Sequence, residues 1–257
     1  MIIIKNEGDQ MAMRAAGAVA SAALSVICGY IKPGVTTREI DLYAAGQIAA
    51  MGGRSAFLGY KNYPCHVCIS INDEVVHGIA GERRLQFGDI ASVDVGVVYR
   101  GFIGDNARTV AVGGCSPVTQ KLMDVTERAL HLGIAQAVHG NHVADISRAI
   151  QCTVESHGFS VVREFVGHGV GRSMHEEPQV PNYYDGKRSS QLRPGMTLAI
   201  EPMVNAGGPA VRVLRDGWTV VTRDGEPSAH FEHTVLITES GPEILTCWDK
   251  MRFPLKV

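Results

Sequence analysis

Residues 93–109 have the sequence V-D-V-G-V-V-Y-R-G-F-I-G-D-N-A-R-T. Apolar residues flank a short glycine-containing turn at 99–101, and this pattern predicts a β-hairpin. Asp94 falls in its first strand and Asp105 in its second, although aspartate is a poor strand residue that is seldom buried without a partner. The stretch therefore sets two acidic side chains into a segment that is otherwise typical of a protein core.

Two registers of this hairpin are open. If the turn centres on the 99–100 peptide bond, Asp94 lies opposite Asp105; if it centres on the 100–101 bond, Asp94 lies opposite Ala107, with Asp105 as its diagonal neighbour. Both registers put the carboxylates on one face, because side chains alternate along a strand. Like charges across a ladder are destabilising, and burying them costs more. A divalent cation between them is one prediction; two solvated aspartates on an edge hairpin are the alternative.

Composition limits the class of protein. The 257 residues are 45% hydrophobic and 19% charged with a net charge of −2, which predicts a globular chain without a nucleic-acid partner or a membrane surface. No apolar run is expected to span a membrane. The six cysteines are predicted to be free thiols in a reducing compartment, and we expect a cytoplasmic protein. The C-x-x-C at Cys65 and Cys68 is a weak zinc signal because it lacks a second pair.

Four helices are expected from caps, breakers and spacing. The first covers residues 9–30 and stops at a Lys-Pro-Gly cluster, and the second follows a capping box and ends near residue 52. Ser-Pro at 116–117 begins a third, to about residue 138, and a fourth covers about 142–157.

The order of elements repeats along the chain. Residues 9–113 give helix, helix, then strands, and residues 116–246 give the same order, with a strand at 161–166 and three or four strands after residue 197. This order predicts an α+β fold of two similar halves in one domain, residues 1–257, with a mixed sheet covered by helices and a site at the seam.

Three further segments carry chemical side chains. A glycine-rich loop is expected at 167–178, G-H-G-V-G-R-S-M-H-E-E-P, whose glycines leave His168 free to project. Glu201 and Glu232 each interrupt an apolar strand. A single such acid often faces solvent, but four acids in apolar strands are costly unless they share cations.

Two aspartates, two glutamates and one histidine offer enough donors for two metal ions. One nitrogen among hard oxygens suits Mn, Fe or Co, and Zn is also allowed. Paired ions activate a water and polarise a carbonyl, so the expected chemistry is metal-assisted hydrolysis.

These motifs together resemble type I methionine aminopeptidase, over nearly the whole chain. The blocks that carry the resemblance are V-D-V-G at 93–96, G-F-I-G-D at 101–105, G-H-G-V-G-R at 167–172, H-E-E-P at 175–178, I-E-P-M at 200–203 and F-E-H-T at 231–234. The resemblance implies the pita-bread fold with pseudo-two-fold halves. It also implies a two-metal site whose ligands are Asp94, Asp105, His168, Glu201 and Glu232, with Asp105 and Glu232 bridging.

The resemblance also implies roles for other residues. His77 would lie near the scissile amide, His175 would contact the substrate carbonyl and its oxyanion, and Glu201 would shuttle a proton from water to the leaving amine. The pocket for a methionine side chain would comprise Tyr60, Tyr63, Cys68, His77, Met174, His175 and Trp218. Phe57 and Met174 depart from many relatives, which often have Cys and Phe there. A monovalent cation is expected near Asn72, Glu74 and Ser228.

The expected activity is removal of the initiator methionine from nascent chains with a small second residue. The type I assignment rests on the missing insertion between Met203 and Glu232. We expect a monomer that meets the ribosome transiently through its own surface, since no docking extension precedes the domain. The alternatives are an Xaa-Pro aminopeptidase or dipeptidase, whose members usually carry a large N-terminal domain, and a non-catalytic binding member of the fold, which typically lacks metal ligands.

Overall fold

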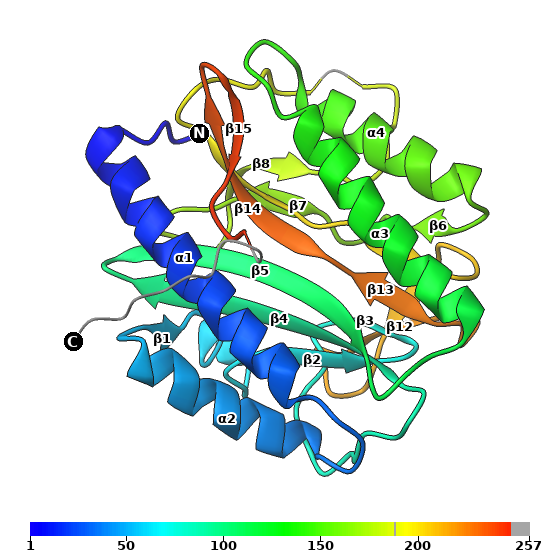
Figure 1. Ribbon diagram of the computed structural model, residues 1–257. Helices are drawn as coiled ribbons and strands as arrows, with labels where there is room; N and C mark the ends of the chain where they lie inside the picture. The colour runs from blue at the N-terminus through cyan, green and yellow to red at the C-terminus, as the bar shows by residue number, and fades with distance from the viewer. Residues whose placement is uncertain (188, 248–257) are drawn as a thin grey trace.

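The structure is a computed structural model, which describes residues 1–187 and 189–247. In these residues four long helices lie over one side of a large antiparallel sheet (Figure 1). They are α1 (Glu7–Tyr30), α2 (Thr37–Ala50), α3 (Pro117–Ala135) and α4 (Val143–Ser156). The predicted capping box is present, because the Thr36 side chain accepts from the Glu39 N–H while Glu39 accepts from the Thr36 N–H. The four predicted helices are confirmed to within a few residues at each end.

The main sheet has nine strands, ordered β1-β4-β5-β14-β9-β7-β8, with β2 also on β4 and β15 also on β14. Two three-stranded sheets, β13-β10-β6 and β11-β12-β3, complete the fold. The strands are β1 (Arg54–Ser55), β2 (Cys68–Ile71), β3 (Glu74–Val76), β4 (Ile90–Tyr99), β5 (Phe102–Ala111), β6 (Ser160–Val161), β7 (Gly167–Gly169), β8 (Glu176–Val180), β9 (Thr197–Ile200), β10 (Met203–Asn205), β11 (Val211–Val213), β12 (Val220–Thr222), β13 (Ser228–His230), β14 (Glu232–Thr238) and β15 (Gly241–Ile244). The predicted α+β architecture is confirmed.

The β4–β5 hairpin adopts the second of the two open registers. Tyr99 pairs with Phe102 and Asp94 pairs with Ala107. The two turn residues, Arg100 and Gly101, both have left-handed φ angles, 49° and 81°. Two-residue turns of this hand match the twist of the strands they join.

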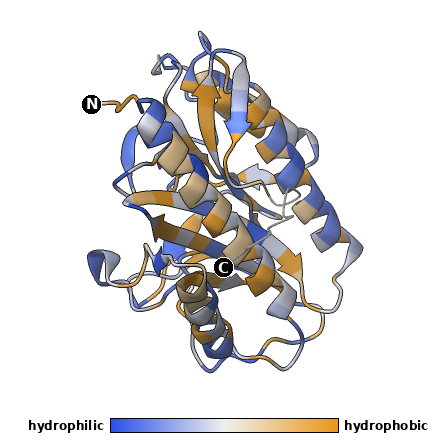
Figure 2. Cartoon of the chain, turned by 60° about the vertical axis from the view of Figure 1, so that its left-hand side comes forward, coloured by the Kyte–Doolittle hydropathy of each residue, from blue (hydrophilic) through white to orange (hydrophobic). Residues whose placement is uncertain are grey.

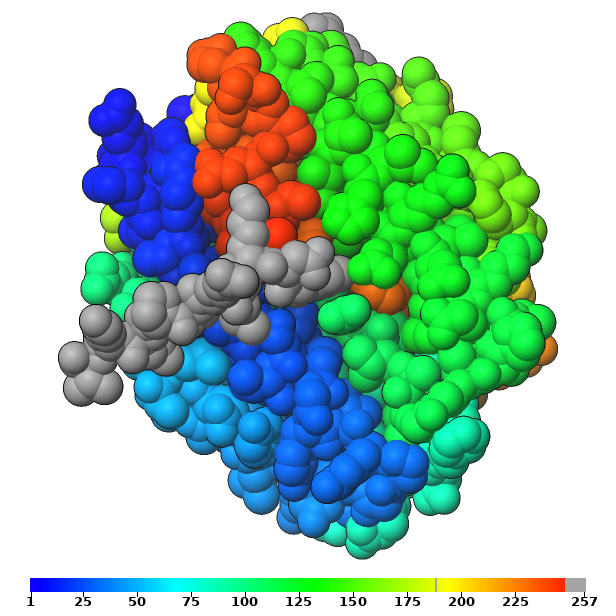
Figure 3. All heavy atoms as spheres, in the orientation of Figure 1, coloured from blue at the N-terminus to red at the C-terminus, as the bar shows by residue number. Residues whose placement is uncertain are grey.

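The seam between the two parts of the chain is a strand pair. β5 belongs to the first part and β14 to the second, and they pair antiparallel with Glu232 opposite Ala107. The main sheet is thus continuous across both parts. Figure 3 shows α1 beside the β14–β15 hairpin on the helix-covered face, with α3 and α4 on its other side.

Three predictions for residues 161–246 are wrong. The strand expected at 161–166 is only β6, the expected glycine loop contains β7 and the start of β8, and seven strands rather than three or four lie from residue 197 onward. Strands of three or four residues are too short to show alternation. The glycines of β7 serve close packing, because a Cβ on Gly167 would lie 2.4 Å from the Ala199 carbonyl oxygen.

Helix α1 is long and apolar enough, by length and composition, to cross a membrane. The expectation that no apolar run is long enough to span a membrane is therefore wrong by length and composition. In the fold, however, α1 packs on β4 and β5, and its Met13, Ala16 and Leu24 are fully buried. Figure 2 shows hydrophilic and hydrophobic residues mixed along the helices, as expected where a helix buries one face.

Contact between α1 and β5 requires glycine at position 104. A Cβ there would lie 2.5 Å from the Ala16 carbonyl oxygen and 2.7 Å from the Gly17 nitrogen, both backbone atoms of α1. Gly104→Ala should therefore push the helix from the sheet and destabilise the protein by about 1–3 kcal/mol or more. Gly46→Ala is the matched control: this exposed glycine within α2 has open space around it, and alanine should stabilise by about 0.5–1 kcal/mol. Urea unfolding of both variants measures this, and equal effects would contradict the packing argument.

Candidate metal and substrate site

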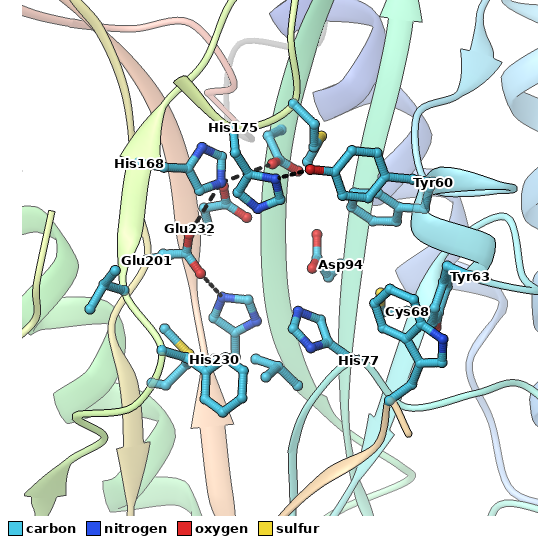
Figure 4. Close-up of a pocket in the computed structure, with 18 of the residues that line it drawn as sticks. Tyr60, Tyr63, Cys68, His77, Asp94, His168, His175, Glu201, His230 and Glu232 are labelled. Atoms are coloured by element: carbon cyan, nitrogen blue, oxygen red, sulfur yellow. Dashed lines mark hydrogen bonds and ion pairs between the residues drawn. The ribbon is translucent and has the colours of Figure 1, made fainter. Parts of the chain in front are cut away.

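The five predicted ligands converge at the seam of the sheet. Asp94 comes from β4, Asp105 from β5 and His168 from β7, while Glu201 follows β9 directly and Glu232 begins β14. Figure 4 shows His168, Glu201 and Glu232 gathered on one side of a cavity with Asp94 facing them. The structure thus brings all five together from strands that are distant in sequence.

His168 has a lone pair available for a ligand. Its Nδ1 lies 2.8 Å from the Gly169 carbonyl oxygen, which can only accept, so Nδ1 carries the hydrogen. Its Nε2 lies 3.4 Å from Glu201 Oε1 and 3.8 Å from Asp105 Oδ2. Burial lowers the pKa of His168 to about 4, so the imidazole is neutral at pH 7 and its bare nitrogen faces carboxylate oxygens. Donor atoms of Asp105, His168 and Glu232 all lie within 4.8 Å of one another.

Several carboxylate oxygens in this cluster lack partners. Asp94 Oδ1, Asp105 Oδ1 and Glu232 Oε1 are buried, and none has a hydrogen-bond donor among the described residues. Buried polar atoms are rarely left in this state. The donor set fits divalent cations, which prefer carboxylate oxygens and imidazole nitrogen.

The electrostatics of the cluster agree with this fit. Burial raises the pKa of Asp105 to about 7. Burial, followed by the nearby negative charge of Asp105, raises the pKa of Asp94, Glu201 and Glu232 well above the usual range. Four such carboxyls cannot all ionise in one buried site unless cations offset their charge.

A cavity of about 200 Å³ opens beside the cluster. All seven predicted pocket residues line it, as do the five predicted metal ligands and Phe57. The sequence did not single out the other lining residues, which are Lys61, Val76, Phe165, Val166, Met203 and His230.

His175 is tied to Tyr60 at one side of the cavity. The Tyr60 hydroxyl lies 2.7 Å from His175 Nδ1, and the centres of the His175 and His168 rings are 4.3 Å apart. Burial, with the positive charge of Lys61 as a second cause, lowers the pKa of His175. A neutral imidazole that accepts the tyrosine hydrogen on Nδ1 carries its own hydrogen on Nε2.

Aromatic edges form the other side. His77 packs edge-on against Phe165 and Trp218, with ring centres 5.6 Å and 6.0 Å away. Its φ is 60°, a strained conformation for a residue with a side chain. Burial, then the charge of His175, lowers its pKa to about 4. Tyr63 packs against the same Trp218 and donates its hydroxyl to the Gly78 carbonyl.

His230 is a buried histidine beside Glu201 that the sequence did not single out. Its Nε2 lies 3.7 Å from Glu201 Oε2 and has no hydrogen-bond partner among the described residues. Burial, then the charge of His77, lowers its pKa to about 3. Alternation was the available signal, because residues 230 and 232 are two apart in nearly extended chain and point to one face.

The residues expected near a monovalent cation are partly together. The Ser228 N–H donates to the Asn72 carbonyl at 2.9 Å, and Asn72 has a left-handed φ of 59°. Glu74 accepts from the Ile71 N–H, and its other oxygen lies 2.9 Å from Arg83. The Glu74 carboxylate thus has partners of its own.

Comparison with known proteins agrees with this site. Residues 11–239 match the family Peptidase_M24, metallopeptidase family M24. Methionine aminopeptidase 1 of Bacillus subtilis strain 168 is 48% identical over 246 residues, which cover 96% of this chain and 99% of the relative. The methionine aminopeptidase of Escherichia coli strain K12 is 45% identical over 247 residues, covering 95% and 94%.

Solved structures give the same result. The crystal structure of methionine aminopeptidase from Rickettsia prowazekii has a TM-score of 0.94 at 40% identity, covering 96% of this chain and 100% of that one. The structure from Thermotoga maritima has a TM-score of 0.93 at 46% identity, covering 96% and 99%. A prolidase from Pyrococcus furiosus, at 22% identity and a TM-score of 0.78, shares the fold alone. The resemblance to methionine aminopeptidases noted in the sequence is confirmed, and the chain belongs to metallopeptidase family M24.

Proposed function

We propose that this protein removes the N-terminal methionine from polypeptides whose second residue is small, with two divalent metal ions at the seam. The observation that carries the proposal is a set of buried carboxylate oxygens without partners among the described residues, beside a cavity with aromatic and thiol walls. The names of the relatives support the substrate, and the family supports the metal-dependent hydrolysis.

Asp94, Asp105, His168, Glu201 and Glu232 would hold the ions. Bound there, the ions would supply an activated water and an electrophile for the peptide carbonyl. Mn, Fe or Co suits one nitrogen among oxygens, and Zn is also allowed. Glu201 would carry the proton from that water to the leaving amine, a role that suits a carboxyl whose pKa is raised.

His175 would donate its Nε2–H to the substrate carbonyl. The hydrogen bond with Tyr60 favours this tautomer, because the tyrosine hydroxyl can fill Nδ1 as donor. His77, held neutral and edge-on to Trp218, would lie near the scissile amide. A neutral donor suits a carbonyl that gains negative charge only in the transition state.

The methionine side chain would enter the aromatic part of the cavity, between Tyr63, Cys68 and Trp218. Aromatic edges and a thiol are favourable contacts for a thioether. Phe57 and Met174 line the same cavity and would set how much room the substrate has.

Other features belong to the same proposal. We propose a single catalytic domain, acting as a type I enzyme in the cytoplasm on nascent chains, monomeric and only transiently at the ribosome. A monovalent cation near Asn72, Glu74 and Ser228 would add to the support of β3 and β13.

The proposed function is tested by release of methionine from Met-Ala-Ser. Metal-stripped protein should be inactive, and Mn, Co, Fe or Zn added separately should restore cleavage. Leu-Ala-Ser and Ala-Pro-Ala are the matched peptides and should remain intact. Cleavage of Ala-Pro-Ala alone would favour an Xaa-Pro peptidase, and no cleavage with two ions bound would favour a non-catalytic member.

Metal removal should make stability depend on pH with a defined sign. The folded-state pKa of Asp105, about 7, is above its unfolded value, so the folded protein retains a proton that the unfolded chain has released. Metal-free protein should therefore lose stability as pH rises from about 4, the value for an unfolded aspartate, to about 7, by up to about 1.4 kcal/mol per pH unit for the retained proton. Thermal unfolding at several pH values measures this, with and without metal.

Two variants test whether Asp105 causes this pH dependence of stability. Asp105→Asn should flatten the pH dependence of the metal-free protein, because the substituted side chain has no proton to lose. Asp124→Asn, at an exposed position on α3, should leave it unchanged. A metal-free protein that gains stability over this pH range would contradict the burial argument.

His175→Ala should lower kcat by about 100-fold to 1,000-fold, the usual effect of losing a donor to the oxyanion. Metal content, measured by mass spectrometry, should stay the same because His175 is not one of the proposed ligands. Tyr60→Phe keeps the ring and removes only the 2.7 Å hydrogen bond, so its effect on kcat should be smaller. Loss of metal and of activity in the same proportion would show that His175 has a structural role instead.

A further inference from the structure

The N-terminal segment buries one charged side chain. Met1, Ile3 and Ile4 are at least half exposed, but Lys5 is only 4% exposed. Its Nζ lies 2.6 Å from Glu176 Oε2, and the two side chains are 3% and 5% exposed. Glu176 directly follows His175, so this ion pair joins the start of the chain to the segment that carries a proposed catalytic residue.

Lys5 is itself held in place by its backbone. Its N–H donates to the Gly195 carbonyl at 2.8 Å, and the Gln10 side-chain amide donates to the Lys5 carbonyl at 2.9 Å. Gly195 and Gln10 belong to the turn before β9 and to the first turns of α1. The ammonium group therefore extends from an anchored backbone.

The segment 171–176 is arranged around this ion pair. Glu176 Oε1 accepts from the Ser173 N–H at 3.3 Å, so the same carboxylate connects the middle of the segment, at Ser173, to Lys5. The Gly171 carbonyl accepts from Ile103 of β5 at 2.8 Å. A Cβ on Gly171 would lie 2.5 Å from Glu176 Oε1 and 2.8 Å from Lys5 Cε. The loop thus leaves space at position 171 for the lysine to reach the glutamate.

Stability alone is a weak reason for such a pair. Desolvating two charges offsets most of their attraction, and apolar residues of similar volume are often as stabilising in their place. What the pair does provide is a fixed distance between Lys5 and the loop that ends in Met174 and His175. Both of these residues line the substrate cavity.

We propose that Lys5 is a positioning residue for His175, acting through its buried ion pair with Glu176. This inference rests on the proposed function, because that function gives His175 a substrate to contact. Lys5 touches neither the cavity nor the metal ligands; it sets the position of the loop on which His175 lies. Displacement of a catalytic group by about 1 Å can lower the rate by about 100-fold.

Lys5→Met, which keeps the unbranched shape and most of the length of the side chain and removes its charge, is the first test. With metal bound, kcat for Met-Ala-Ser should fall by about 10-fold to 100-fold, while metal content is unchanged. In a His175→Ala background, the same substitution should lower kcat by less than about 2-fold, because the two residues act through one contact. Equal loss in both backgrounds would overturn the proposal.

Arg14→Met is the matched control. Arg14 also forms an ion pair from the N-terminal region, at 2.7 Å to Glu243, but on the surface and away from the loop. Its substitution should leave kcat unchanged. If Lys5→Met does not fold, two variants replace it: Glu176→Gln and the charge-free double variant Lys5→Met/Glu176→Gln. Both should lower kcat much less in the His175→Ala background than when His175 is present.

Hydrogen exchange gives a measurement that does not need turnover. In the metal-loaded full chain, Lys5→Met should speed amide exchange in a peptide covering residues 170–177 and leave the β4–β5 hairpin unchanged. Unchanged exchange in the loop would refute the positioning role even if methionine is released. Faster exchange in a protein that never cleaves Met-Ala-Ser would instead support the positioning of the loop by Lys5 and reject the proposed function.

Discussion

Burial of four carboxylates at one point is the constraint on which the rest of the structure depends. Such a cluster repels itself, so each carboxylate needs a backbone that cannot move away. Thr234 provides this for Asp105: its hydroxyl donates to the Asp105 carbonyl at 2.8 Å and accepts the Asp105 N–H at 3.1 Å. The two central strands of the seam are thereby joined beside the site through a side chain as well as through their ladder.

The seam also explains the distribution of the proposed metal ligands. The β4–β5 hairpin provides the two aspartates, and the strands of the second part provide the histidine and the two glutamates. Neither part alone has enough donors for a pair of ions. Because the β5–β14 pairing brings Glu232 opposite Ala107, which is itself opposite Asp94, the proposed metal centre can form only when both parts are folded against each other.

Local sequence patterns predicted the hairpin and the helices. The features that depend on contacts between distant segments could not be predicted. Asp94 and Asp105 were found because alternation along a hairpin is a local rule, and the helices were found from caps within three or four residues. The register was left open because two turns fit one sequence. The strands β7 and β8 were missed because they form by close approach of glycines to distant backbone. Nothing in the sequence near Lys5 indicates a partner 171 residues away.

The metal cluster and the substrate pocket share one strand, and this limits how either can change. Cys68 of β2 lies opposite Asp94 in the ladder with β4. Two residues further along β4, Gly96 leaves room for the Phe57 ring, since a Cβ there would lie 2.5 Å from it. A thiol wall, an aromatic wall and a proposed metal ligand are therefore fixed relative to one another by hydrogen bonds of a single strand. Substitutions at position 57 or 68 can alter the room for a side chain, but the separation between that room and the carboxylates is set by the backbone.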